Sequence, residues 1–136
     1  MILEINKNIF LKEINLEHTI LRMRNDGIVQ INFGDNIELD GDKTKEIVNT
    51  IGILTEGKKA LILDIAGENT TAGAEARSYS ASVEGNRFTI ADAFVVNSLA
   101  QKLIVNFYLN FHKPVVPTKA FDGVDKAIEW LKSHAV

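Results

Sequence analysis

Two adjacent threonines follow an apolar run, at a place where a hydroxyl group could accept a phosphate. The segment LILDIAGENTTAGAEAR occupies 61–77, and it predicts a buried strand, a turn and the start of a helix. Free N–H groups at a helix start stabilise added negative charge, so Thr71, or its neighbour Thr70, would suit a phosphorylation switch. Glu68 and Glu75 would oppose a phosphate there. We favour the alternative, in which one threonine only caps the helix.

Arg77 and Asp64 are the other charged residues that flank this turn. Arg77 could bind an anion or a partner carboxylate, or its stem could lie over the sheet edge with its head in water. Asp64 ends a predicted central strand, where an α/β enzyme would place a catalytic or metal-binding acid. No phosphate-binding glycine loop, nucleophile elbow or partner base accompanies it, and the three histidines lack metal-ligand spacing. We therefore expect no catalytic residue, no metal site, no cofactor, and a structural role for Asp64.

The helix predicted from 98 to 112 carries more apolar residues than one face requires. Its core-facing arc is predicted to contain Leu99, Leu103, Ile104, Phe107 and Phe111. Val105 and Leu109 form an i, i+4 pair outside this arc, with Tyr108 nearby. Together with Arg77, these three residues are our candidates for a dimer or partner surface. The alternatives are ordinary surface residues or a face covered by the N-terminal segment.

Aromatic residues of this helix and of the sheet could instead enclose a small apolar ligand such as a lipid. The candidates for the lining of such a pocket are Phe94, Phe107, Phe111, Phe121 and Trp130. Aromatic residues at these spacings more often belong to an ordinary core, so the pocket is the second hypothesis.

The elements that must position these residues begin with a hairpin and a helix. Asp26-Gly27 lies between two segments rich in branched apolar residues and predicts a tight hairpin turn. Ile47, Ile51 and Leu54 have helical spacing, and Gly57 ends that helix. The run KALILDIA at 59–66 is too continuous for a strand with one wet face, so it predicts a central strand covered on both sides.

Helices and strands then alternate to the end of the chain. We expect a helix over about 72–83, a strand over 89–96, the helix from 98 with a capping box of Ser98 and Gln101, and a final helix from Asp122. Pro114 and Pro117 bracket an edge strand or an extended connection. Residues 1–15 are compatible with a strand or a short helix. This order predicts an α/β fold with a mixed sheet of about four to six strands, antiparallel at the N-terminal hairpin.

Composition limits the function classes. A chain of 136 residues with 46% hydrophobic residues predicts one domain with a real core. Its 15 basic residues are scattered and are outnumbered by 18 acidic ones, which argues against nucleic acid as a partner. The absence of cysteine fits a reducing compartment, and no apolar run is long enough for a membrane span. We expect a soluble, cytoplasmic protein.

The C-terminal third carries a recognisable series of short motifs. They are, in order, Asn97-Ser98, Asn106-Phe107, Lys113-Pro114, Pro117-Thr118-Lys119, Phe121 and Ala127 to Leu131. In these motifs the chain resembles the small bacterial proteins grouped as STAS-like or STAS/SEC14-like domains. Upstream, Asp26-Gly27, Asp64 and Ala76-Arg77 also fit, so the resemblance spans about residues 18–133.

The resemblance implies the fold of the anti-sigma-factor antagonists, which bind a partner protein under phosphorylation control. Their acceptor lies in a pattern similar to Asp-Ser-Ser-Gly; here Asn69 replaces the acid and Gly73 comes one residue late, with Thr71 closest to the acceptor. We therefore expect a non-enzymatic regulatory or protein-interaction module with a protein partner, which could also be a second copy of the chain. The alternative is a carrier or sensor of a small apolar ligand.

Overall fold

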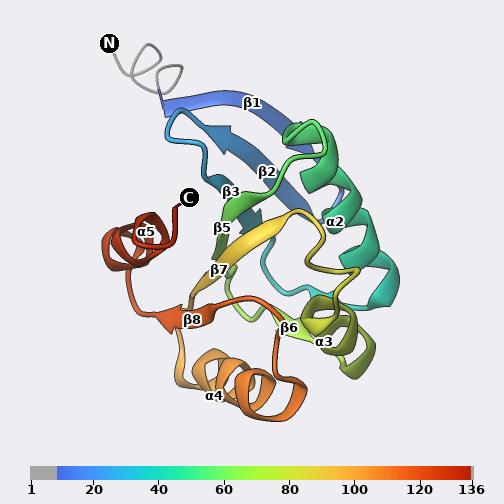
Figure 1. The fold of residues 1–136 in the computed structure, drawn as a ribbon. Helices are drawn as coiled ribbons and strands as arrows, with labels where there is room; N and C mark the ends of the chain where they lie inside the picture. The colour runs from blue at the N-terminus through green and yellow to red at the C-terminus, as the bar shows by residue number, and fades with distance from the viewer. Residues whose placement is uncertain (1–8, 136) are drawn as a thin grey trace.

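A six-stranded sheet runs through the centre of the structure, a computed structural model in which residues 9–135 are described (Figure 1). The strand order is β1-β2-β3-β5-β7-β8. The strands are β1 Phe10–Asn15, β2 Thr19–Arg24, β3 Val29–Phe33, β5 Ala60–Ile65, β7 Thr89–Val95 and β8 Thr118–Phe121. The first three pair antiparallel, and β3, β5, β7 and β8 pair parallel. The prediction of an α/β fold with a mixed sheet and an N-terminal antiparallel hairpin is confirmed.

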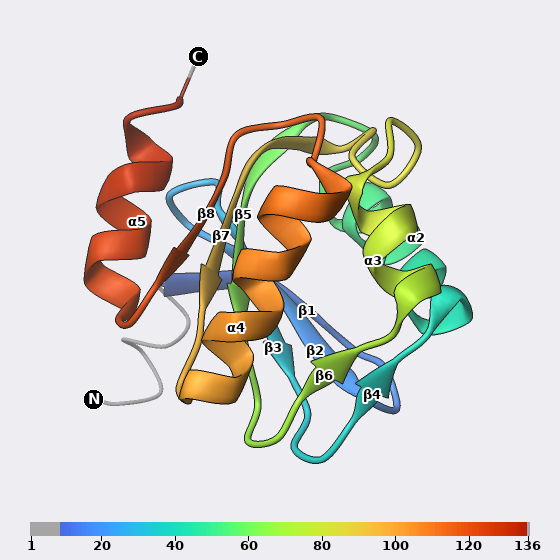
Figure 2. The same cartoon turned by 90° about the horizontal axis from the view of Figure 1, so that it is seen from below.

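Helices cover both faces of this sheet. Three of them, α2 Gly41–Leu54, α3 Ala74–Ala81 and α4 Leu99–Phe107, lie on one side, and α5 Val124–Lys132 lies on the other (Figure 2). A π-helical turn, η1 Tyr108–His112, continues α4. A second, two-stranded parallel sheet joins β4 Glu38–Leu39 to β6 Thr71–Ala72. Of the segment left open at 1–15, residues 10–15 form β1, and the first eight lie outside the described residues.

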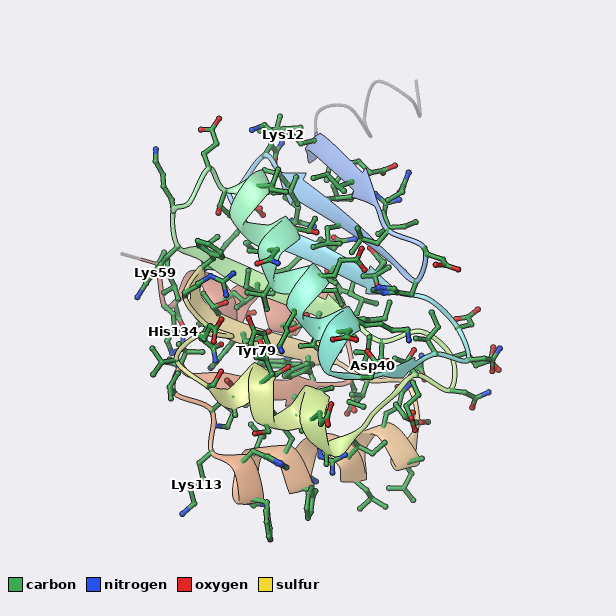
Figure 3. The ribbon with its side chains drawn as sticks, turned by 90° about the vertical axis from the view of Figure 1, so that its right-hand side faces the viewer. Lys12, Asp40, Lys59, Tyr79, Lys113 and His134 are labelled. Carbon is green, nitrogen blue, oxygen red and sulfur yellow. The ribbon has the colours of Figure 1, made fainter. Side chains whose placement is uncertain are left out.

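Local sequence explains the main element boundaries. Gly27 adopts φ of 84° in the β2–β3 turn, a conformation that glycine adopts without steric cost, as the Asp-Gly pair predicted. The Asp40 side chain lies at the start of α2 and accepts a hydrogen bond of 2.8 Å from the backbone N–H of Lys43 (Figure 3). The helix predicted over 72–83 is shorter, because Ala72 belongs to β6 and the helix has ended by Ser82. Residues 113–117 form a connection to β8.

Two apolar layers sandwich the sheet. The face toward α2 contains Leu21, Val29, Ile31 and Ile62, packed against the helical residues Ile47, Ile51 and Leu54. The opposite face packs Leu61, Leu63, Ala91 and Ala93 against Ala127 and Leu131 of α5. The central strand β5 is therefore buried on both faces, as its continuous apolar run predicted. The space that remains beside the α2 layer, under α3 and α4, holds the candidate site.

Candidate functional site

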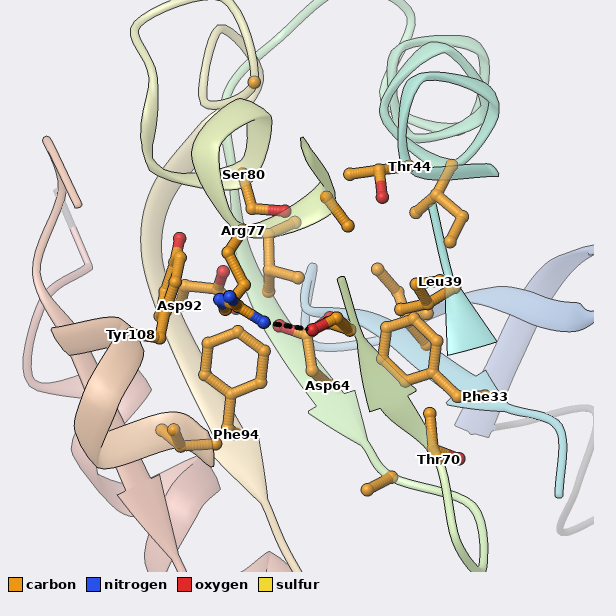
Figure 4. Close-up of a pocket in the computed structure, with 18 of the residues that line it drawn as sticks. Phe33, Leu39, Thr44, Asp64, Thr70, Arg77, Ser80, Asp92, Phe94 and Tyr108 are labelled. Carbon is orange, nitrogen blue, oxygen red and sulfur yellow. Dashed lines mark hydrogen bonds between the residues drawn. The ribbon is translucent and has the colours of Figure 1, made fainter. Parts of the chain in front are cut away.

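A cavity of about 150 Å³ lies between the sheet and the helices α2, α3 and α4 (Figure 4). Its walls are mainly apolar, and the sheet side also carries two carboxyl groups. The apolar lining includes Ile31, Ile47, Ile51, Ile62, Phe94 and Val105. The polar lining includes Asp64, Asp92, Arg77 and Tyr108. The cavity therefore joins an apolar body to a small polar region.

Strand register brings the two carboxyl groups together. In the parallel pairing of β5 with β7, Ile62 lies opposite Asp92 and Asp64 lies opposite Phe94. Since side chains two residues apart point to the same face of a strand, both aspartates face the cavity and are diagonal neighbours. Of this pair, only Asp64 was predicted as a candidate site residue. The signal for the pair is a second aspartate, Asp92, within the next buried strand.

Burial raises the pKa of Asp64 well above its ordinary value, and the negative charge of Asp92 raises it further. Burial also raises the pKa of Asp92. The two carboxyl groups are buried neighbours, and a charge on one disfavours a charge on the other, so the pair holds a proton where exposed aspartates would have lost theirs. Burial raises the pKa of the Tyr108 hydroxyl as well, so that side chain is neutral.

Neither carboxyl group has a neighbouring cation in ion-pair contact. None of the ion pairs formed by residues 9–135 includes Asp64 or Asp92. The Oδ1 atom of Asp92 is buried and has no hydrogen-bond partner. Such a group is costly in a low-dielectric interior, which makes this end of the cavity a place where a bound donor would be stabilised.

Arg77 projects from α3 toward the cavity and is held from two sides. Its Nη1 donates to the backbone carbonyl of Ala72, and its guanidinium lies 5.2 Å from the centre of the Phe107 ring. Its Nε atom is buried and has no partner. Arg77 is half-buried, and the expectation that its head group lies free in water is wrong for Nη1 and for the buried Nε.

Gln101 fixes the start of α4 over the cavity. Its backbone N–H donates to the Ser98 hydroxyl at 3.2 Å, as the capping box predicted. Its side chain accepts from the backbone N–H of Asn97 at 2.9 Å and donates to the carbonyl of Gly67 at 2.7 Å. The side chain therefore ties α4 to the loop that follows β5.

The two threonines do not cap α3, so that interpretation is wrong. Gly73 precedes the helix and provides no side-chain cap. The Thr70 hydroxyl is buried and donates to the carbonyl of Gly34 at 2.9 Å. Thr71 is exposed and belongs to β6, where its backbone N–H donates to the carbonyl of Ile37 at 2.9 Å. Residues 71–73 form backbone hydrogen bonds and strand pairing with residues 37–39, so this segment is extended and α3 begins only after it.

The predicted orientation of α4 is also wrong for four of the five residues of its core-facing arc, while the fifth, Ile104, lines the cavity. Gln101, Val105 and Tyr108 face the sheet and are buried, whereas Leu109 is only partly buried. The side chains that point outward are Leu99, Leu103, Phe107 and Phe111, which are 73%, 59%, 45% and 73% exposed. Val105 and Tyr108 therefore cannot form an external partner surface. We call the four outward residues the α4 stripe.

The five aromatic residues proposed for an apolar pocket are dispersed. Phe94 lines the cavity and contacts the Tyr108 ring edge-on, with a centroid distance of 5.9 Å. Phe107 and Phe111 stack on each other in the α4 stripe. The remaining two, Phe121 and Trp130, pack together on the α5 side of the sheet. The proposed lining was therefore wrong at these four positions.

Within residues 9–135, no group of three or more histidine, cysteine, aspartate or glutamate side chains is placed to hold a metal ion. No helix in that range is both long enough and apolar enough to cross a membrane. The cavity is the feature that combines burial, polar groups without partners and space for a ligand.

The fold and the site define an α/β domain with a partly polar cavity between its sheet and its helices. The sequence pattern of one family matches residues 21–135, so the chain belongs to that family, which is described as a domain of unknown function (DUF7793). No curated protein and no solved structure matches the chain.

Proposed function

We propose that this domain binds a small, largely apolar ligand in the cavity between the sheet and α4, and works as a carrier or sensor of that ligand. The observation that carries the proposal is the cavity of about 150 Å³ itself. Cavities of about this volume, lined by leucine, isoleucine and phenylalanine, stay dry and accept benzene in proteins. The natural ligand would accordingly have an apolar body of roughly that size.

The polar groups in the cavity wall indicate a ligand-binding site rather than an accidental gap in the packing. Asp92 Oδ1 and Arg77 Nε are both buried without partners, and both residues line the same cavity. Native interiors seldom leave such atoms unpaired, since each one costs about 1–3 kcal/mol. A ligand with a polar group would supply the missing partner.

Toluene is expected to bind the full chain saturably and to shift the NMR signals of Ile62 and Val105, which line the cavity. At about 100 times its Kd it should raise the free energy of unfolding by about 2.7 kcal/mol. Val105→Phe should fill the cavity and abolish binding, because the side chain is only 8% exposed and points inward. Leu103→Phe, which adds a ring on the outer side of the same helix, is the control and should bind toluene normally. Binding that survives Val105→Phe would contradict the proposal.

A second candidate function, a regulatory protein-interaction module, is favoured by the α4 stripe. Its four residues recur every fourth position and form one ridge of exposed apolar side chains. We propose a second copy of the chain as the occupant, with the two ridges packed against each other about a two-fold axis. Lys102 is the only charged residue between 99 and 111, so two copies of this face meet with little charge repulsion. Membership of the STAS-like group and phosphorylation at Thr71 stay predictions.

Leu103→Asp is expected to convert a dimer into a monomer, because it places a charge in the middle of the buried ridge. Light scattering of the full chain over a range of concentrations measures the change in mass. Asn110→Asp, which adds the same charge at an exposed position outside the stripe, should leave the mass unchanged. A wild-type chain that remains monomeric at every concentration would remove this function.

A further inference from the structure

We propose that the cavity selects a primary amine: a molecule with a small apolar body whose ammonium group binds to Asp64 and Asp92. This inference rests on the proposed ligand-binding function and names the chemical class of the ligand. It starts from the two carboxyl groups on neighbouring strands, which face one cavity and have apolar side chains around them.

The carboxyl groups provide acceptors that the protein leaves without donors. Asp64 is only 6% exposed, and the strand register places it beside Asp92. Asp92 Oδ1 has no partner. An ammonium group carries three donors and a positive charge, so one ligand group can bind both side chains.

The other polar groups at the cavity do not supply this charge. Among the described residues that line the cavity, Arg77 of α3 is the one cation; its Nη1 donates to the Ala72 carbonyl and its guanidinium lies against the Phe107 ring, and it forms no ion pair with either aspartate. Tyr108 of η1 contributes a neutral hydroxyl, and α2 contributes the uncharged Thr44. The negative charge of the aspartate pair is therefore left for a ligand to neutralise.

The proton held by the aspartate pair makes the binding of an amine depend on pH differently from the binding of a neutral alcohol. In the empty cavity the aspartate pair keeps a proton, because burial and mutual repulsion raise its pKa. When an ammonium group binds, its charge replaces that proton, which passes to the solvent. An alcohol donates a hydrogen bond and displaces no proton. Amine binding should therefore strengthen as the pH rises, up to the pKa of the amine itself.

Three probes of nearly equal size test the inference by calorimetric titration of the full chain: benzylamine, benzyl alcohol and toluene. At about pH 8 benzylamine is expected to bind at least about tenfold more tightly than benzyl alcohol, and this preference should shrink toward about pH 5. The heat of amine binding should also depend on the buffer, because protons are released. Asp64→Asn should remove the preference while toluene still binds, and Asp125→Asn, at an exposed position on α5, should keep it. Asp92→Asn provides an independent second test of the pair.

The outcomes separate this inference from the proposed function. If toluene and benzyl alcohol bind while benzylamine is no tighter, the amine is wrong and the cavity function stands. An amine preference that persists in both aspartate variants would place the ammonium elsewhere and overturn the inference. If none of the three probes binds, the proposed function and the inference fail together.

Discussion

Asp64→Asn is expected to stabilise the ligand-free protein at neutral pH, with a gain that disappears toward pH 4. The physical reason is that the folded state keeps a proton on the buried aspartate pair that the unfolded chain has already lost. Each unit by which folding raises a pKa costs about 1.4 kcal/mol once the solution pH exceeds the folded pKa. Asparagine has no proton to lose, and its amide group can donate a hydrogen bond to the neighbouring Asp92.

The sign of the pH dependence follows from the direction of the shift. Below the ordinary aspartate pKa of about 3.9 both states are protonated, and the pair carries no penalty. As the pH rises from there through the raised folded pKa, the unfolded state is increasingly favoured, and stability falls. The wild-type protein should therefore lose stability over this window, and the variant should lose less.

Urea unfolding between about pH 4 and about pH 8 measures this difference as two free-energy curves that diverge with pH. The matched control is Asp125→Asn, which removes an exposed carboxyl group from the first turn of α5 and should run parallel to the wild type. If the unfolding free energy of Asp64→Asn also runs parallel to that of the wild type over this pH range, the aspartate pair does not have a raised pKa.

Those elements of the fold could be predicted from the sequence for which a single local sequence pattern determines the secondary structure. The run ALILDI predicted a central strand because a strand buried on both faces has no polar alternation. The Asp26-Gly27 turn predicted the hairpin because Gly27 can adopt a positive φ. In both segments, neighbouring residues alone carry the necessary information.

The site could not be predicted in the same way, because contacts distant in sequence decide it. Periodicity assigned α4 to the sheet by its larger apolar arc, but the hydrogen bond from Gln101 to Gly67 turns the smaller arc inward. The sequence pattern placed Thr71 at the start of a helix, but in the structure Thr71 belongs to β6, which pairs with β4. Asp64 and Asp92 become neighbours only through the register of β5 and β7, which neither strand reveals alone.

Gly67→Ala is expected to destabilise the protein by at least about 1–3 kcal/mol and to weaken ligand binding, because the added methyl group has no space. A Cβ atom at this position would lie 2.4 Å from the carbonyl oxygen of Gly34 and 2.6 Å from that of Phe33. Both obstacles are backbone atoms, so no side-chain rotation relieves the clash. Thermal and urea unfolding of the variant measure the loss.

Binding should suffer together with stability because the same backbone contacts hold the wall of the cavity. The loops after β3 and β5 are joined by hydrogen bonds from Asn36 N–H to the Glu68 carbonyl and from the Thr70 hydroxyl to the Gly34 carbonyl, at 2.7 and 2.9 Å. The Gly67 carbonyl accepts the bond from Gln101 that positions α4. Separating the loops would therefore displace α4 from the cavity.

Gly123→Ala is the matched control, since a Cβ atom there meets nothing within 4 Å and the residue has an ordinary φ of −148°. It should cost only a few tenths of a kcal/mol to about 1 kcal/mol, as expected for loss of glycine at a helix N-cap, and should bind toluene normally. Equal stability of the two variants would show that the loops can separate freely. A destabilised Gly67→Ala protein with unchanged toluene affinity would show instead that the position of α4 does not depend on the Gln101 bond.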